Sequence, residues 1–187
     1  NFDRKIHVKQ AEELTANLWF GLDFNCDFMT AVLGCSYSDG TIHYFDEIRQ
    51  SNSNTEQLAI AMKKIAPGIN VYPDATGSAR STTSNKSDHT ILRDHGFNVI
   101  AKKINPPIID RINALNRMLQ DANGKIRMTV DPKCTYLIKD LEQVQRSRDG
   151  KIDKVKDITL THAFDACSYY IAMKHPVVQR LVTSSQW

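Results

Sequence analysis

Three aspartates stand where their carboxylates could act together on a metal ion. Asp23 ends an apolar run over residues 18–24, and Asp74 ends a second apolar run over residues 69–74. Asp165 lies one turn into a helical segment and would be a third acidic group if that helix packs across the sheet edge. Two adjacent carboxylates repel one another unless cations join them, and such a triad suits hard divalent ions. A strand-end aspartate is also a common turn or cap residue, so a structural role is the alternative for each.

His162 and Asp27 are further polar candidates close to these aspartates in the sequence. His162 precedes Asp165 by three residues and shares its helical face, where it would orient a ligand or contact a nucleophilic water or a phosphate. A structural histidine is the alternative. Asp27 follows Asp23 by four residues and is a candidate auxiliary carboxylate, although a turn or solvated position also explains it. The histidines and cysteines form no recognisable nucleophile motif, so Ser-His-Asp or Cys-His hydrolysis is not indicated.

Apolar periodicity predicts the elements that must position these side chains. The order is strand, strand, strand, helix, strand, helix, strand, followed mainly by helices. The first three strands form an antiparallel meander and later strands add in parallel, which predicts a mixed α/β sheet flanked by helices. Ligand sites in such sheets gather at the carboxyl ends of adjacent strands. We expect strands over residues 18–24, 30–37, 41–48, 69–74, 97–101 and 125–130, a polar loop over 75–85, and helices over 53–65 (opening with a capping box at 53–56), 88–95, 108–119, 134–144 and 160–174.

The composition limits the protein to ordinary globular classes. The chain has 187 residues, 41% of them hydrophobic and 24% charged, and no repeat or linker, so we expect one domain over residues 1–187 with a polar leader at 1–16. No run approaches the roughly 18 apolar residues of a membrane span, and no signal peptide is evident. The chain begins without Met, as a processed or excised piece would. Single cysteines without zinc-ligand spacing predict packing residues in a reducing cytosol: Cys26, Cys35, Cys134 and Cys167.

The placement of positive charge favours a nucleic-acid partner, although a net charge of +3 does not require one. A basic β-hairpin is predicted over residues 143–158 around the turn dipeptide Asp149-Gly150. It would contact the phosphate backbone of duplex DNA without reading sequence, or would be only a solvated edge that resists aggregation. No base-reading motif and no phosphate-binding loop is evident, so we expect weak sequence specificity and no ATP hydrolysis. The candidate DNA contacts flank the site or lie in the hairpin: Arg80, Lys86, Lys102, Lys103, Arg146, Arg148, Lys151 and Lys154.

The segments that carry the candidate residues resemble a known family. It is the nuclease domain of tailed-phage large terminase subunits, and the likeness spans almost the whole chain. The resemblance implies a ribonuclease H-like fold of the resolvase and integrase type. It further implies that Asp23, Asp74 and Asp165 hold two divalent ions, Mg²⁺ or Mn²⁺. The segments are GLDF (21–24), YPDATGSARS (72–81) and LTHAFDA (160–166), with further likeness over 103–111 and 123–127.

The resemblance also implies a reaction, partners and a cellular setting. Two ions about 3.5–4 Å apart clamp one phosphodiester, one activating the attacking water and the other stabilising the leaving oxygen. Asp23, on the central strand, would bridge both ions, while Asp74 and Asp165 would each hold one. The substrate implied is concatemeric double-stranded DNA in the cytoplasm of the infected host cell. The partners implied are an ATPase domain on a missing N-terminal segment, the small terminase subunit and the portal protein.

Two alternatives to a packaging nuclease stay open. One is a nuclease similar to Holliday-junction resolvases, which a preference for branched DNA would reveal. The other is a non-catalytic module that docks DNA or a motor and whose carboxylates are structural. Aspartate-to-alanine variants with unaltered stability and no magnesium effect would favour the second alternative.

Overall fold

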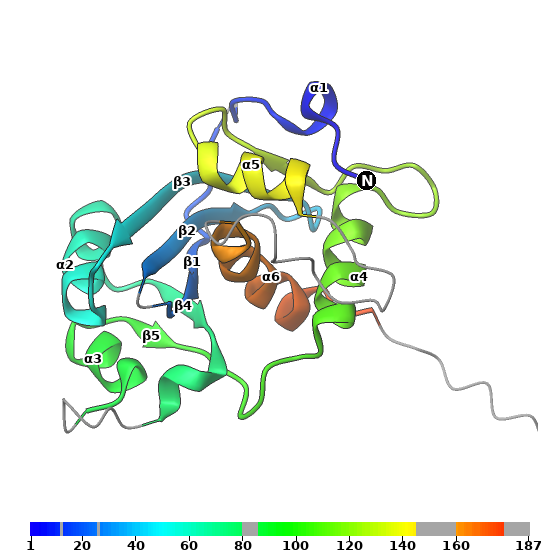
Figure 1. The fold of residues 1–187 in the computed structure, drawn as a ribbon. Coiled ribbons are helices and arrows are strands. Elements are labelled where there is room, and N and C mark those ends of the chain that lie inside the picture. The colour runs from blue at the N-terminus through cyan, green and yellow to red at the C-terminus, as the bar shows by residue number, and fades with distance from the viewer. Residues whose placement is uncertain (12, 26, 80–85, 145–159, 178–187) are drawn as a thin grey trace, which may run out of the picture.

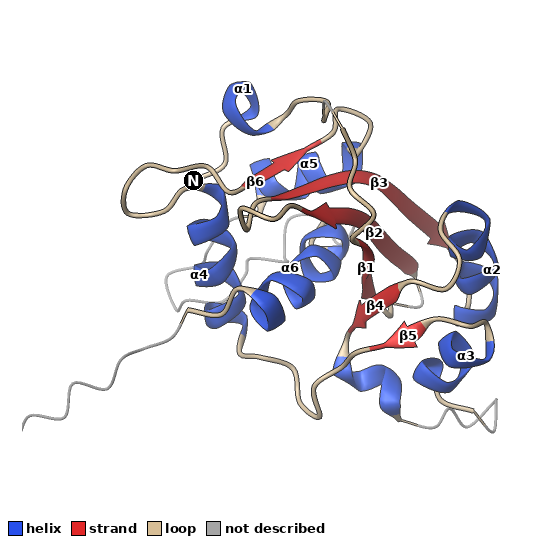
Figure 2. Ribbon diagram, turned by 180° about the vertical axis from the view of Figure 1, so that it is seen from behind, coloured by secondary structure: helices blue, strands red, loops and turns tan. Residues whose placement is uncertain are grey.

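A computed structural model describes residues 1–11, 13–25, 27–79, 86–144 and 160–177 of the chain. Within these residues, six strands form one sheet in the order β5-β4-β1-β2-β3-β6 (Figures 1 and 2). The first three strands are the predicted antiparallel meander, and the other three add in parallel. The mixed α/β sheet predicted from the sequence is thereby confirmed. The strands are β1 (Leu18–Asp23), β2 (Phe28–Ser36), β3 (Ile42–Ser51), β4 (Asn70–Pro73), β5 (Asn98–Val99) and β6 (Met128–Val130).

Helices cover both faces of this sheet (Figure 2). The apolar side chains of α2 and α3 pack with Phe20 and Leu22 of β1 in one core, while those of α4, α5 and α6 pack with Trp19 in the other. Because β1 is buried on both faces, its sequence is a continuous apolar run. The helices are α2 (Thr55–Ile65), α3 (Asp88–Asp94), α4 (Ile108–Leu119), α5 (Thr135–Gln143) and α6 (His162–Lys174), with the short α1 (Arg4–His7) and the 3₁₀ turn η1 (Ala75–Ser78).

α6 crosses β1 in close contact at Gly21. A Cβ atom at Gly21 would overlap the backbone carbonyl oxygen of Ala166. Glycine is therefore required sterically at this position of β1. Asp23 lies two residues beyond Gly21, and Asp165 directly precedes Ala166. The contact thus brings the end of β1 and the first turn of α6 together.

α6 is buried around its whole circumference rather than along one face. Every residue from His162 to Ala172 is buried. The reason is that α6 packs on β1, β2 and β4 while also contacting α4 and α5. A helix enclosed in this way has no solvated face to reveal its orientation by periodicity.

Several boundaries also differ from the predicted ones. Asn54, whose side chain accepts a hydrogen bond from Gln57 N at 3.0 Å, caps α2 in place of the predicted Ser53. Residues 125–127 precede β6 instead of joining it, because Lys125 N donates to Asp121 Oδ1 at 3.0 Å in the preceding loop. The predicted loop over 75–85 begins with η1, and the segment expected as a polar leader contains α1. All but the first two residues of the predicted hairpin lie outside the described part of the chain.

Three of the four cysteines are described. Cys35, Cys134 and Cys167 are free and buried, as packing residues would be, and Cys26 lies outside the described residues. Among the described helices, none has both the length and the apolar character needed to span a membrane.

Candidate active site

Asp23 and Asp74 lie at the carboxyl ends of two neighbouring parallel strands. β1 pairs with β4 in parallel, with Leu22 opposite Pro73, so the aspartate after each partner comes at the same edge. Asp74 N donates to Leu22 O at 3.1 Å, which continues the pairing to this point. Both residues are buried, with only 7% and 8% of their surface exposed. The sheet topology thus places the two aspartates side by side.

Asp165 reaches the same edge from the first turn of α6. Its surface is 6% exposed, and the contact of Ala166 with Gly21 holds the turn against β1. Burial raises the pKa of Asp23 most strongly, and repulsion from Asp165 and then from Asp74 raises this pKa further. Asp165 and Asp74 are therefore both near enough to Asp23 to repel its charge.

His162 is the direct partner of Asp23. Its Nδ1 lies 3.0 Å from Asp23 Oδ2, and both side chains are at most one-tenth exposed. This hydrogen bond, and the attraction between the two groups, lower the pKa of Asp23 against the effect of burial. The sequence placed His162 beside Asp165 by helical spacing. In the structure its Nδ1 contacts the carboxylate of Asp23 on the central strand.

Asp74 is held by main-chain and side-chain donors. Its Oδ1 accepts from Thr76 N at 2.7 Å, so it caps η1, and from Asn105 Nδ2 at 2.5 Å. Asn105 also accepts from Ala75 N at 2.8 Å, and His89 Nε2 lies 2.8 Å from the carbonyl oxygen of Asp74. The capping role raised from the sequence is therefore present. It leaves Asp74 at the edge of the sheet with a fixed orientation.

Arg111 of α4 is the partner of Asp165. Its Nη1 lies 2.7 Å from Asp165 Oδ1 and 2.7 Å from Ser168 Oγ, and its guanidinium carbon lies 4.6 Å from the centre of the Tyr169 ring. Both charged side chains of this ion pair are only 9% exposed. A buried cation thus offsets part of the negative charge of the three aspartates.

Sequence reasoning assigned no role to Asn105 or Arg111. Both lie in the segment 103–111, which was singled out only for its resemblance to a family. A signal was present for Arg111, because it stands between Ile108 and Ile112 within an otherwise apolar helical stripe. A charged residue in such a stripe indicates a buried partner. That partner is Asp165, which lies 54 positions away in the chain, so the local sequence does not identify it.

The donor set fits a hard divalent cation in its chemistry. Three carboxylates from three elements converge, and oxygen ligands of this kind are those that Mg²⁺ and Mn²⁺ prefer. As positioned, no three described His, Cys, Asp or Glu side chains form a group that could hold a metal ion. Each aspartate is instead engaged by its own protein donor: His162, Asn105 or Arg111. A carboxylate has two oxygens, so a donor can orient one while the other binds a cation.

The remaining candidates lie further out or outside the described residues. Asp27 is exposed in the turn between β1 and β2, where its carbonyl oxygen accepts from Asn52 N at 3.3 Å. Lys86 forms an exposed ion pair with Asp94 at 2.6 Å. Lys102 and Lys103 are both exposed, between β5 and α4. Outside the described residues lie Arg80, Arg146, Arg148, Lys151 and Lys154.

Comparison with known proteins identifies the family. Residues 20–174 match the family described as the terminase RNaseH-like domain. The chain belongs to this family. The match includes all three converging aspartates of this terminase domain. The comparison with curated proteins gave no match.

Solved structures show the same fold. The nuclease domain of the P22 large terminase is 18% identical, with a TM-score of 0.71 over 94% of this chain and 91% of that chain. The nuclease domain of the large terminase of bacteriophage SPP1, solved with bound Mn, is 17% identical, with a TM-score of 0.54 over 87% and 94%. The large terminase nuclease of thermophilic phage G20c is 13% identical, with a TM-score of 0.56 over 91% and 95%. The ribonuclease H-like fold of this terminase domain is thereby confirmed, and the roles of single residues stay predictions.

Proposed function

We propose that this terminase domain is a divalent-metal-dependent endonuclease that cuts concatemeric double-stranded DNA with weak sequence specificity during viral genome packaging. The observation that carries the proposal is the convergence of Asp23, Asp74 and Asp165 at one edge of the sheet. Three buried carboxylates with mutual repulsion are costly for the fold alone, which points to a cationic ligand.

We assign Asp23 as the ligand shared by two ions and Asp74 and Asp165 as ligands of one ion each. When bound, two Mg²⁺ or Mn²⁺ ions would activate a water molecule and offset the charge that develops on the leaving oxygen. His162 orients Asp23 through the contact of 3.0 Å between Nδ1 and Oδ2. Asn105 likewise orients Asp74. The manganese in the related SPP1 structure supports this class of cation.

The charge around the site supports DNA as substrate. Lys102 and Lys103 come shortly before Asn105 in the chain. Lys86 follows residues 75–85, which come directly after Asp74. Contacts from such side chains to phosphates position a duplex without reading its bases. We further propose that the full protein carries an ATPase domain and that its partners are the small terminase subunit and the portal, with the host cytoplasm as its setting.

The test is metal-dependent cleavage of supercoiled plasmid by the purified domain in Mg²⁺, Mn²⁺ and EDTA. We expect nicking and linearisation in either metal, abolished by EDTA and by Asp23→Asn or Asp165→Asn. The matched control is Asp39→Asn, because Asp39 is an exposed aspartate in the turn between β2 and β3, at the opposite end of the sheet. Circular dichroism confirms that each variant is folded.

Three results would count against the proposal. Equal cutting by wild type and the Asp23 and Asp165 variants would remove the carboxylates from the reaction. Intact plasmid under every condition would favour a docking module. A strong preference for four-way junctions over plasmid would instead favour a resolvase-like nuclease.

A further inference from the structure

The helices α5 and α6 both begin without a side-chain cap of their own. Cys134 precedes α5 and Thr161 precedes α6, and neither side chain accepts a hydrogen bond from its helix. Thr161 has a φ of 85°, in the left-handed region that β-branched residues rarely adopt. Its Oγ1 is buried without a hydrogen-bond partner among the described atoms. The first N–H groups of each helix therefore need acceptors from elsewhere in the fold.

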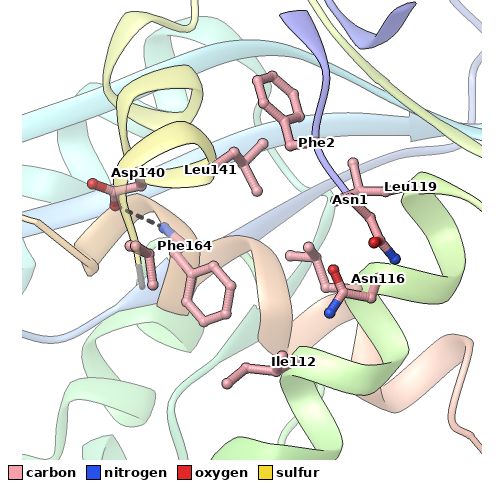
Figure 3. A pocket seen from close by; sticks show the side chains of 10 residues that line it. Asn1, Phe2, Ile112, Asn116, Leu119, Asp140, Leu141 and Phe164 are labelled. Carbon is pink, nitrogen blue, oxygen red and sulfur yellow. Dashed lines mark hydrogen bonds between the residues drawn. The ribbon is translucent and has the colours of Figure 1, made fainter. Parts of the chain in front are cut away.

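Asp140 of α5 supplies the acceptor for α6. Its Oδ2 accepts from Phe164 N at 3.0 Å, a bond drawn in Figure 3. The carboxylate is 1% exposed, and burial raises its pKa, while hydrogen bonds from the backbone N–H groups of Phe164, Thr161 and Ala163 lower it. A negative charge at a helix N-terminus is also favoured by the helix dipole. One buried side chain thus fixes the turn that contains His162.

Glu47 of β3 does the same for α5. Its two carboxylate oxygens accept from Tyr136 N at 2.7 Å and from Leu137 N at 2.9 Å. Each carboxylate therefore comes from a neighbouring element rather than from the helix it caps. The sheet holds the start of α5, and α5 holds the start of α6.

We propose that Glu47 and Asp140 are positioning residues that act in series to set the place of His162 and Asp165 in the nuclease site. The inference rests on the proposed function, because it assigns both carboxylates to the support of that site. It explains why two charged side chains are used where a helix would normally supply its own cap. Rotation of the first turn of α6 would move His162 away from Asp23 and Asp165 away from the sheet edge.

The test compares Asp140→Asn and Glu47→Gln, which remove the charge and keep the side-chain size, with wild type. Mn²⁺ affinity is measured by electron paramagnetic resonance without DNA, and kcat and KM are measured on plasmid. Supporting partners of metal ligands typically contribute about 10–100-fold. We expect Asp140→Asn to lose about that much in Mn²⁺ affinity and kcat, with KM for DNA unchanged. Because the residues act in series, the double variant should be no worse than Asp140→Asn alone.

The control for loss of a helix cap is Asn54→Ala, which removes the N-cap of α2. It should lower the melting temperature while leaving kcat and Mn²⁺ affinity at wild-type values. Wild-type values for both folded test variants, or losses matched by Asn54→Ala, would overturn the inference. If Asp140→Asn does not fold, the Mn²⁺ affinity and kcat of Glu47→Gln alone test the inference.

Failure of the proposed function gives a different pattern. A wild type that binds Mn²⁺ but cuts no DNA refutes the nuclease, and the Mn²⁺ affinities of the variants still decide the positioning role. A wild type that neither binds Mn²⁺ nor cuts DNA overturns both.

Discussion

Replacing Arg111 by methionine removes the buried cation beside Asp165 and leaves an unbranched, uncharged side chain. The ion pair has an N–O distance of 2.7 Å, and each side chain is only 9% exposed, so little solvent screens the charge that remains. Removing one partner of a buried pair leaves an uncompensated charge and costs about 3–5 kcal/mol. An exposed pair would contribute at most about 1 kcal/mol. We therefore expect Arg111→Met to lower the free energy of unfolding by about 3–5 kcal/mol in EDTA.

Divalent cations should restore part of the lost free energy of unfolding, because a cation that binds the aspartates replaces the positive charge of the missing guanidinium. A ligand at 100 times its dissociation constant stabilises the folded state by about 2.7 kcal/mol. The positive charge of Arg111 at one oxygen of Asp165 competes electrostatically with a cation bound at the other oxygen. Mn²⁺ should therefore bind Arg111→Met more tightly and stabilise it more than wild type at equal concentration. Urea unfolding of both proteins, with Mn²⁺ and with EDTA, measures the difference.

Asp165→Asn provides the matched comparison, since it removes the charge that Arg111 offsets. In the Arg111→Met background it should recover most of the lost stability, and the four proteins then form a double-mutant cycle. A loss below about 1 kcal/mol for Arg111→Met would show that the pair is effectively solvated. Equal stabilisation of both proteins by Mn²⁺ would refute the competition.

Three further predictions concern other contacts of the fold. Gly21→Ala should lower the free energy of unfolding by about 1–3 kcal/mol in urea titrations, because the added Cβ overlaps the carbonyl of Ala166. Asn105→Ala should reduce plasmid cleavage about 10–100-fold, because it removes a donor that orients Asp74; unchanged cleavage would exclude that role. The pKa of His43 is lowered, chiefly by burial, so the unfolded chain takes up the proton first and stability falls as the pH drops below about 6.5. His43→Asn should flatten this decline, measured as unfolding free energies at about pH 7 and pH 5, whereas an identical slope would contradict the assignment.

The sequence alone determined the order and type of most elements and the position of the candidate carboxylates. Strand and helix periodicities depend on residues two to four positions apart, so they can be recognised without tertiary information. Because carboxyl ends of adjacent parallel strands meet, the aspartates after two apolar runs already predicted a shared edge. The structure places Asp23 and Asp74 at that edge.

The partners of those carboxylates were decided by tertiary structure alone. Arg111 and Asp165 are 54 positions apart, and Asp140 and Phe164 are 24 apart. No local pattern specifies which buried charge meets which, because that choice depends on how α4 and α5 pack against α6. The same packing encloses α6 on all sides, which removes the polar face that sequence periodicity detects. Local spacing therefore predicts which residues reach the site, and the packing of distant elements sets their hydrogen bonds and their charge balance.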